Sequence, residues 1–155
     1  MNAESLMTRE VCVCSPNDSL QQAARIMWES DVGCLVVTDA QGRPIGMITD
    51  RDVAMAAYTQ GAALRDAKVA SAMSRQLLHC SPSTSLGELE KVMQASQIRR
   101  IPVVDTDGKL VGVVTLADIA RSSQAGPLRM TEAPGVAKTL ASITQRRQPS
   151  AVAAE

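Results

Sequence analysis

The most informative part of the sequence is Gly46-Met-Ile-Thr-Asp-Arg-Asp52, because it occurs again as Gly112-Val-Val-Thr-Leu-Ala-Asp118. The two copies are 66 residues apart, and the similarity continues around them without a gap. Between residues 7–54 and 73–120, sixteen of the 48 aligned pairs are identical. Such self-similarity indicates one supersecondary unit used twice. Two units can pack about a pseudo-twofold axis, and the seam between them is a place where small molecules bind.

Each copy predicts the same succession of elements. A short β-prone stretch (11–14, 77–80) ends at Ser-Pro, and a helix follows whose start has the form of a capping box. Two β-branched runs around an Asp/Gly turn then predict a hairpin, at 34–38 with 44–49 and at 101–104 with 110–115. The second helix is predicted at about 51–58 and 117–122. The sequence therefore predicts an α/β (α+β) fold of two tandem β-α-β-β-α repeats.

The chain divides into three predicted segments. The first repeat with its linker occupies 1–65, the second repeat 66–123, and a C-terminal tail 124–155. Within the tail we expect one helix at 136–145. The rest of the tail is rich in proline and small residues, a composition typical of loosely ordered chain.

The composition argues against several classes of partner. Sixteen basic residues balance sixteen acidic ones, and Trp28 and Tyr58 are the only aromatic residues. Single-stranded nucleic-acid binders combine basic grooves with aromatic platforms, which this chain lacks. No apolar run approaches the roughly 20 residues that span a bilayer, and residues 1–10 lack the features of a signal peptide. We therefore expect a cytoplasmic protein that contacts neither nucleic acid nor membrane.

The chemistry-bearing side chains do not form a catalytic or metal-binding pattern. Cys12, Cys14, Cys34 and Cys80 are expected to be reduced thiols, and their spacing relative to His79 matches no zinc motif. The sequence contains no nucleophile–base pair, no glycine-rich phosphate loop and no cluster of carboxylates. We expect no bound metal, no required cofactor and no enzymatic activity.

Taken together, these features resemble a pair of CBS (cystathionine-β-synthase) domains over about residues 7–122. The resemblance is carried by the Met-(Thr/Ser) start of each copy, the Ser-Pro before the capped helix, the strand Ile101-Pro-Val-Val-Asp105 and the closing Gly-x-x-Thr-x-x-Asp motif. It implies a flat module with up to two clefts for an adenosine-containing ligand. AMP, ADP, ATP and S-adenosylmethionine are ligands of this kind.

The resemblance also implies roles for particular residues. The closing Asp takes the ribose hydroxyls, since a carboxylate accepts strong hydrogen bonds from a vicinal diol. The motif Thr reaches toward phosphate near a helix start, and basic residues before the second-copy strand reach phosphate as well. Arg51 is nominated by its position alone. The candidate ligand-binding residues are Thr49, Arg51, Asp52, Arg99, Arg100, Thr115 and Asp118.

The two sites are expected to be unequal, because Arg99 and Arg100 stand where the first copy has Gly33 and Cys34. Two functions remain open. The chain could be a regulatory sensor of an adenine nucleotide, a homodimer that signals to an unidentified regulated protein through the arrangement of its repeats. Alternatively, Thr-x-x-Asp only caps a helix, and the chain is a ligand-independent dimerisation or protein-interaction module.

Overall fold

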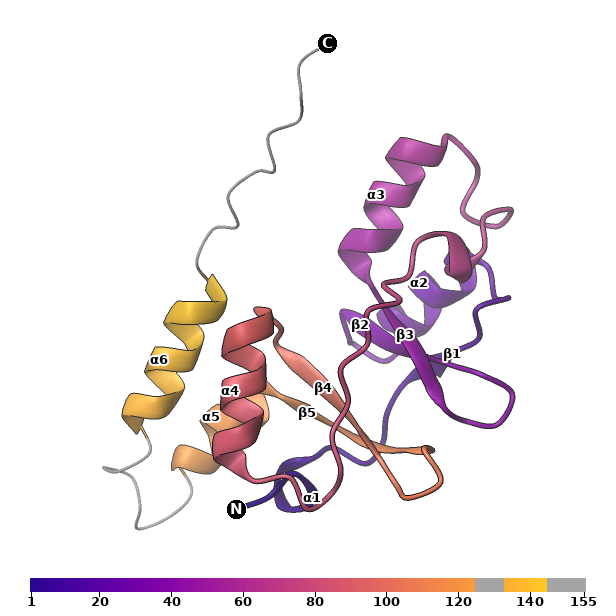
Figure 1. Ribbon diagram of the computed structural model, residues 1–155. Helices are drawn as coiled ribbons and strands as arrows, with labels where there is room; N and C mark the ends of the chain where they lie inside the picture. Colours follow the sequence, from indigo (N-terminus) through magenta and orange to yellow (C-terminus); the bar gives the residue numbers. More distant parts are fainter. Residues whose placement is uncertain (125–132, 145–155) are drawn as a thin grey trace.

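The computed structural model describes residues 1–124 and 133–144, and it consists of two repeats of the same architecture (Figure 1). The first repeat contains β1 (Val13–Cys14), α2 (Leu20–Glu29), β2 (Cys34–Thr38), β3 (Pro44–Thr49) and α3 (Asp50–Gln60). The second contains α4 (Leu86–Ser96), β4 (Arg100–Val104), β5 (Leu110–Thr115) and α5 (Leu116–Gln124). Three further elements are α1 (Ala3–Leu6), the 3-10 turn η1 (Val69–Ser71) and α6 (Ala133–Thr144). The predicted mixed fold of two tandem repeats is confirmed.

The hairpins of the two repeats have the same register. Cys34 pairs with Thr49 in the first repeat, and Arg100 pairs with Thr115 in the second. Each hairpin turns around an aspartate whose side chain accepts two backbone N–H groups. Asp39 Oδ1 accepts from the residues at 41 and 43 at 2.9 and 2.8 Å, and Asp105 Oδ1 accepts from those at 107 and 109 at the same distances. The hydrogen bonds within the Asp/Gly turns therefore fix the register of the two strands in each hairpin.

The outer strand differs between the repeats. β1 pairs in parallel with β2, whereas the predicted strand at 77–80 is wrong and contributes only the bridge between Cys80 and Val103. In the first repeat the N–H of Val36 donates to the carbonyl of Cys12 at 3.2 Å. The equivalent residue in the second repeat is Pro102, which has no N–H to donate. This missing hydrogen bond explains the shorter pairing.

Each repeat has its own apolar core beneath its sheet. The helical spacing predicts a buried stripe on α2 of Leu20, Ala23, Ala24, Met27 and Trp28. Leu20, Ala23 and Met27 are buried and Ala24 is half-buried, but the prediction is wrong for Trp28, which is 88% exposed. α4 buries Leu89 and Met93 in the same way. Both helices begin at a serine that accepts a hydrogen bond from the backbone N–H three residues later. Local capping and the apolar stripe together place each helix on its sheet.

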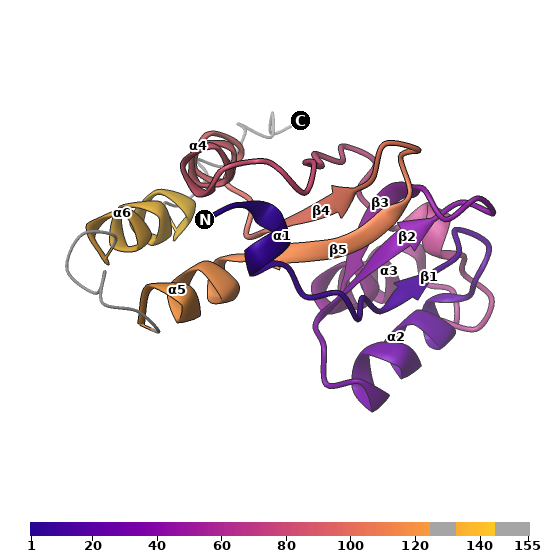
Figure 2. The ribbon, with the colours of Figure 1, turned by 90° about the horizontal axis from the view of Figure 1, so that it is seen from below.

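The two repeats exchange short segments. α1 belongs to the second core, where Ala3 and Leu6 are buried with Leu89 and Ile119, and Figure 2 shows it beside β5. In the opposite direction, Val69 of η1 is fully buried in the core of the first repeat. The boundary at 65/66 therefore separates the repeats in sequence but not in packing.

Backbone bridges complete the exchange. Thr8 and Val113 exchange two N–H···O bonds of 2.9 Å, and Ser74 and Met47 exchange bonds of 2.9 and 3.1 Å. Thr8 is equivalent to Ser74, and Met47 is equivalent to Val113, so each repeat gives the other the same segment. Reciprocal contacts of this kind are the signature of twofold symmetry. The Met-(Thr/Ser) start of each copy is thus a strand partner for the opposite sheet.

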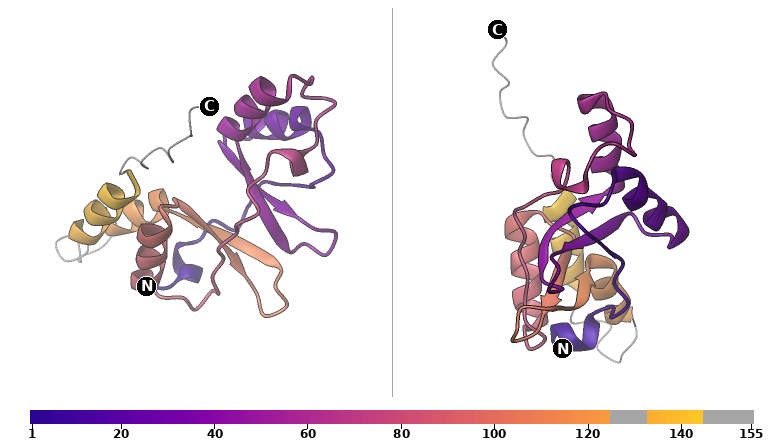
Figure 3. Two further views of the ribbon diagram at one scale, coloured as in Figure 1. Left: turned by 45° about the horizontal axis from the view of Figure 1, so that its top comes forward. Right: turned by 90° about the vertical axis from the view of Figure 1, so that its right-hand side faces the viewer.

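α6 lies against α4 and α5, on the side of the second repeat away from the first (Figure 3). Gln94 Nε2 donates to Thr139 Oγ1 at 2.7 Å, and Thr139 and Ile143 are buried. A helix was expected at 136–145. The structure has it from Ala133 to Thr144, and residue 145 with the remainder of the tail lies outside the described residues. Among the residues that the structure describes, α6 therefore covers the second repeat, and no equivalent helix covers the first.

Candidate functional site

Both Thr-x-x-Asp motifs form capping boxes where a strand runs into a helix. At α3, Thr49 donates to Asp52 Oδ2 from its backbone N–H at 2.8 Å and from its hydroxyl at 2.7 Å, and Thr49 Oγ1 accepts the Asp52 N–H at 3.2 Å. At α5, Thr115 and Asp118 repeat this arrangement at 2.8, 2.5 and 3.2 Å. Capping engages Oδ2 of each carboxylate. Oδ1 is left for another partner, so capping and ligand binding are compatible.

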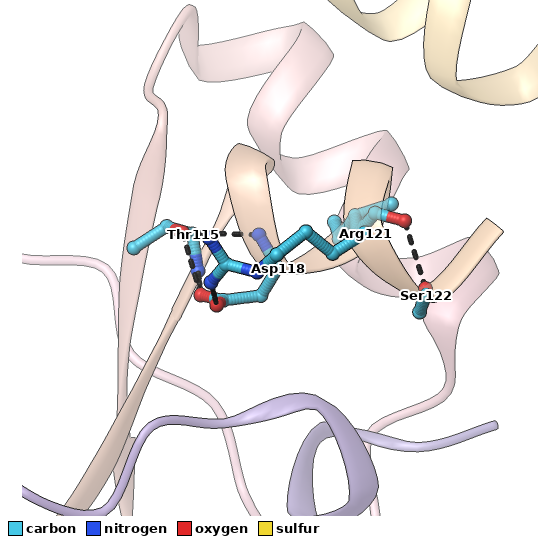
Figure 4. A network of polar contacts seen from close by, with 5 residues as sticks. Thr115, Asp118, Arg121 and Ser122 are labelled. Carbon is cyan, nitrogen blue, oxygen red and sulfur yellow. Dashed lines mark hydrogen bonds and ion pairs between the residues drawn. The ribbon is translucent and has the colours of Figure 1, made fainter. Parts of the chain in front are cut away.

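The two motifs differ in the hydrogen-bond partner of the second carboxylate oxygen, Oδ1 of Asp52 or of Asp118. In the second repeat Arg121, one turn further along α5, forms an ion pair with Asp118 Oδ1 (Figure 4). The equivalent residue in the first repeat is Met55, which cannot donate a hydrogen bond. Within the described part of the chain, Asp52 Oδ1 has no hydrogen-bond partner. The two aspartates therefore have unequal surroundings, although their backbones are equivalent.

A cleft of about 410 Å³ lies between the repeats and contains part of the predicted site. Its second-repeat wall includes Arg100, Thr115, Asp118 and Arg121. The opposite wall comes from the first repeat and from the segment before β1. Those residues are Thr8, Glu10, Val11, Cys12, Asp31, Val32, Gly33, Cys34, Val36 and Met47. The volume lies in the range of small-molecule sites, about 300–1,000 Å³.

A second cleft, of about 610 Å³, is related to the first by the pseudo-twofold axis. Leu77, Leu78 and Ile98 line it at positions equivalent to Val11, Cys12 and Val32 of the first cleft. Neither Thr49 nor Asp52 is among its lining residues. The Thr and Asp of the second closing motif therefore line the first cleft, whereas Thr49 and Asp52 line neither of these two clefts.

Of the seven predicted ligand-binding residues, the structure places three in a cleft between the repeats. Arg100, Thr115 and Asp118 meet in the cleft of about 410 Å³. Thr49, Asp52, Arg51 and Arg99 line neither of these two clefts, and Arg51 and Arg99 are exposed. Arg100 lines both clefts, since it stands near the axis that relates them.

Arg100 also lies close to its own repeat equivalent, Cys34. Burial raises the pKa of the Cys34 thiol, and the Arg100 guanidinium opposes this increase through its charge and a hydrogen bond. A cation in this position favours an anion at the centre of the seam. Arg100 is therefore the residue best placed to attract the anionic part of a ligand in either cleft.

Sequence reasoning did not identify Arg121 or the first-repeat wall at Asp31–Cys34. The signal for Arg121 was its position three residues after Asp118, where side chains of a helix face each other. The opposite wall had no comparable signal, because it meets Asp118 only through the packing of the two repeats.

Two further findings concern the described residues alone. No three His, Cys, Asp or Glu side chains gather there as ligands of a metal would. Across the same residues, no helix is long and apolar enough to cross a bilayer.

Known proteins share this architecture. The CBS domain family model matches residues 3–58 and 69–125. The CBS domain-containing protein YhcV of Bacillus subtilis is 40% identical over 121 residues, which are 77% of this chain and 83% of YhcV. The crystal structure of Hypoxic Response Protein I with two coordinated zinc ions is 32% identical, with a TM-score of 0.71, and the match covers 78% of this chain and 98% of that one.

A third solved structure contains adenosyl ligands. It is the CBS domain pair of protein MJ0100 in complex with 5'-methylthioadenosine and S-adenosyl-L-methionine, 23% identical with a TM-score of 0.71. The match covers 80% of this chain and 96% of that one, and at this identity it shows the shared fold. With two family matches that span both repeats, the chain belongs to the CBS domain family and consists of a pair of CBS domains.

Proposed function

We propose that this chain is a regulatory sensor that binds an adenine nucleotide or a related adenosyl ligand in the cleft between its repeats. The observation that carries the proposal is the meeting of Arg100, Thr115 and Asp118 in one cleft of about 410 Å³. Asp118 offers a carboxylate for ribose, and Arg100 offers donors for phosphate. Thr115 holds the Asp118 carboxylate in place through its backbone N–H and its hydroxyl. The adenosyl ligands of the MJ0100 domain pair support this choice of ligand class.

The proposed mechanism is linkage between ligand binding and the arrangement of the repeats. The cleft has walls from both repeats, so a ligand favours the arrangement that fits it, and a regulated protein responds to that arrangement. In this proposal the protein acts in the cytoplasm, catalyses no reaction and requires no cofactor. AMP, ADP, ATP and S-adenosylmethionine are the first ligands to test.

The test is a titration of the full chain with each of these ligands, followed by thermal unfolding and calorimetry. A ligand at 100 times its Kd should stabilise the native state by about 2.7 kcal/mol. Asp118→Asn keeps the volume of the side chain but removes its charge, and we expect it to weaken binding by about 10- to 100-fold.

Asp52→Asn is the matched control, because it makes the same change in the other capping box, outside the cleft. We expect it to leave the affinity within about twofold of the original value. Equal losses in the two variants, or a flat response to every ligand, would contradict the sensor.

A second candidate function, self-association, is favoured by the uncovered helices of the first repeat. Trp28 on α2 and Tyr58 on α3 are 88% and 83% exposed. The repeat equivalent of Trp28 is Gln94, which is hydrogen-bonded to α6. A hollow of about 350 Å³ beside Trp28, lined by Ala24, Met27 and Val53 among others, can receive a side chain of a second copy. Large exposed aromatic residues are typical of interfaces.

Trp28→Glu is therefore expected to convert a homodimer into a monomer, because it places a charge at the centre of the apolar contact. Light scattering coupled to gel filtration at several concentrations measures the mass. Val13→Glu is the control, since Val13 is 42% exposed and belongs to β1 and not to these helices. A mass that stays that of a dimer in the Trp28 variant would place the interface elsewhere.

A further inference from the structure

Neither the capping boxes nor the proposed function explains the presence of Arg121 in the candidate cleft. Its guanidinium forms an ion pair with Asp118 Oδ1. The Arg121 side chain is 71% exposed, whereas that of Asp118 is 7% exposed. The arginine therefore covers the carboxylate from the solvent side, and both residues line the cleft.

The hydrogen bonds of Asp118 show how the ion pair with Arg121 limits the binding of a ligand to the carboxylate. A carboxylate has about four lone-pair positions on its two oxygens. Oδ2 accepts two donors from Thr115, and Oδ1 accepts Arg121. At most one position, on Oδ1, remains open, whereas a ribose diol brings two donors. A ribose can satisfy both hydroxyls on Asp118 only if Arg121 leaves.

Arg121 is well placed to leave. Its side chain is long and mostly exposed, so the guanidinium can rotate away from α5 without disturbing the core. The Asp118 carboxylate is buried and needs a donor in place of the arginine, and the ribose hydroxyls supply one. Once displaced, the guanidinium stays at the edge of the cleft, where it can pair with a ligand anion. Planar, bidentate binding of phosphate is a characteristic role of arginine.

We propose that Arg121 is an exchangeable specificity residue that selects phosphorylated nucleosides over uncharged ones. Ribose hydroxyls replace Arg121 on Asp118, and the freed guanidinium binds the ligand phosphate on the side opposite to Arg100. An uncharged nucleoside must break the ion pair and gives the arginine no new partner. This inference rests on the proposed function, since it requires the ribose to bind at Asp118.

The experiment compares AMP with adenosine by calorimetry on the full chain and on Arg121→Met, which copies the Met55 of the first repeat. We expect the original protein to prefer AMP by at least about tenfold. Arg121→Met should bind adenosine more tightly and AMP more weakly, so the preference falls by about tenfold or more. Arg121→Gln should change the two affinities in the same directions as Arg121→Met. Met55→Arg, which lies outside the cleft, should leave the preference for AMP over adenosine unchanged.

Two results would overturn the inference in distinguishable ways. If AMP and adenosine both bind and both depend on Asp118, but Arg121→Met leaves their ratio unchanged, Arg121 is not a specificity residue and the proposed function stands. If neither compound binds the original protein and Asp118→Asn changes nothing with any adenosyl ligand, the proposed function fails, and this inference fails with it.

Discussion

Gly46→Ala is expected to destabilise the protein by about 3 kcal/mol, at the upper end of the range for overpacking substitutions. A Cβ at this position would lie 2.5 Å from the backbone carbonyl oxygen of Ser74. That oxygen cannot move freely away from the added Cβ, because it accepts the N–H of Met47 at 3.1 Å in the bridge between the repeats. The added methyl group therefore has to break or distort the segment exchange.

Gly112→Ala is the matched comparison, and we expect it to cost only about 1 kcal/mol. There the Cβ would meet the side chain of Met7, with Sδ at 2.5 Å. A methionine side chain is unbranched and can adopt another rotamer. Urea unfolding followed by circular dichroism measures both values. Equal destabilisation in the two variants would show that the carbonyl of Ser74 does not set the requirement for glycine.

Leu6→Ala is expected to lower the free energy of unfolding by about 3 kcal/mol, because it removes a buried side chain and leaves a cavity. Leu6 is 8% exposed and packs in the core of the second repeat. Hydrogen exchange should accordingly become faster in α4 and β5 than in α2 and β2.

Leu78→Ala provides the control, since Leu78 is 45% exposed and belongs to neither core. It should change stability by less than about 0.5 kcal/mol. Faster exchange confined to the first repeat in Leu6→Ala would contradict the assignment of α1 to the second core.

The hairpins were predictable because their signals are local. The strands β2, β3 and β5 begin and end where the β-branched runs and the Asp/Gly turns predict. The helices α2 and α4 follow from a serine cap and an apolar stripe. In each case, residues within about ten positions of each other determine the element.

The predictions that failed or were absent depend on distant partners. The strand expected at 77–80 required an N–H donor at position 102, and proline occupies it. α1 was not predicted, because a four-residue helix has little propensity of its own and this one is held by packing on the second repeat. The same holds for the cleft wall at Asp31–Cys34, which meets Asp118 across the seam.

The reciprocal segments also set an order of events during synthesis. The first repeat can form the bridge at Met47 only after Ser74 has left the ribosome, because these two residues exchange backbone hydrogen bonds. Thr8 is made early, yet its partner Val113 lies on the last strand of the sheets, so the N-terminal segment must wait unpaired for most of translation. Contacts between distant parts of a chain form slowly. Separate production of the two halves would leave each sheet without its edge residues, whereas co-expression would let the halves restore them to each other.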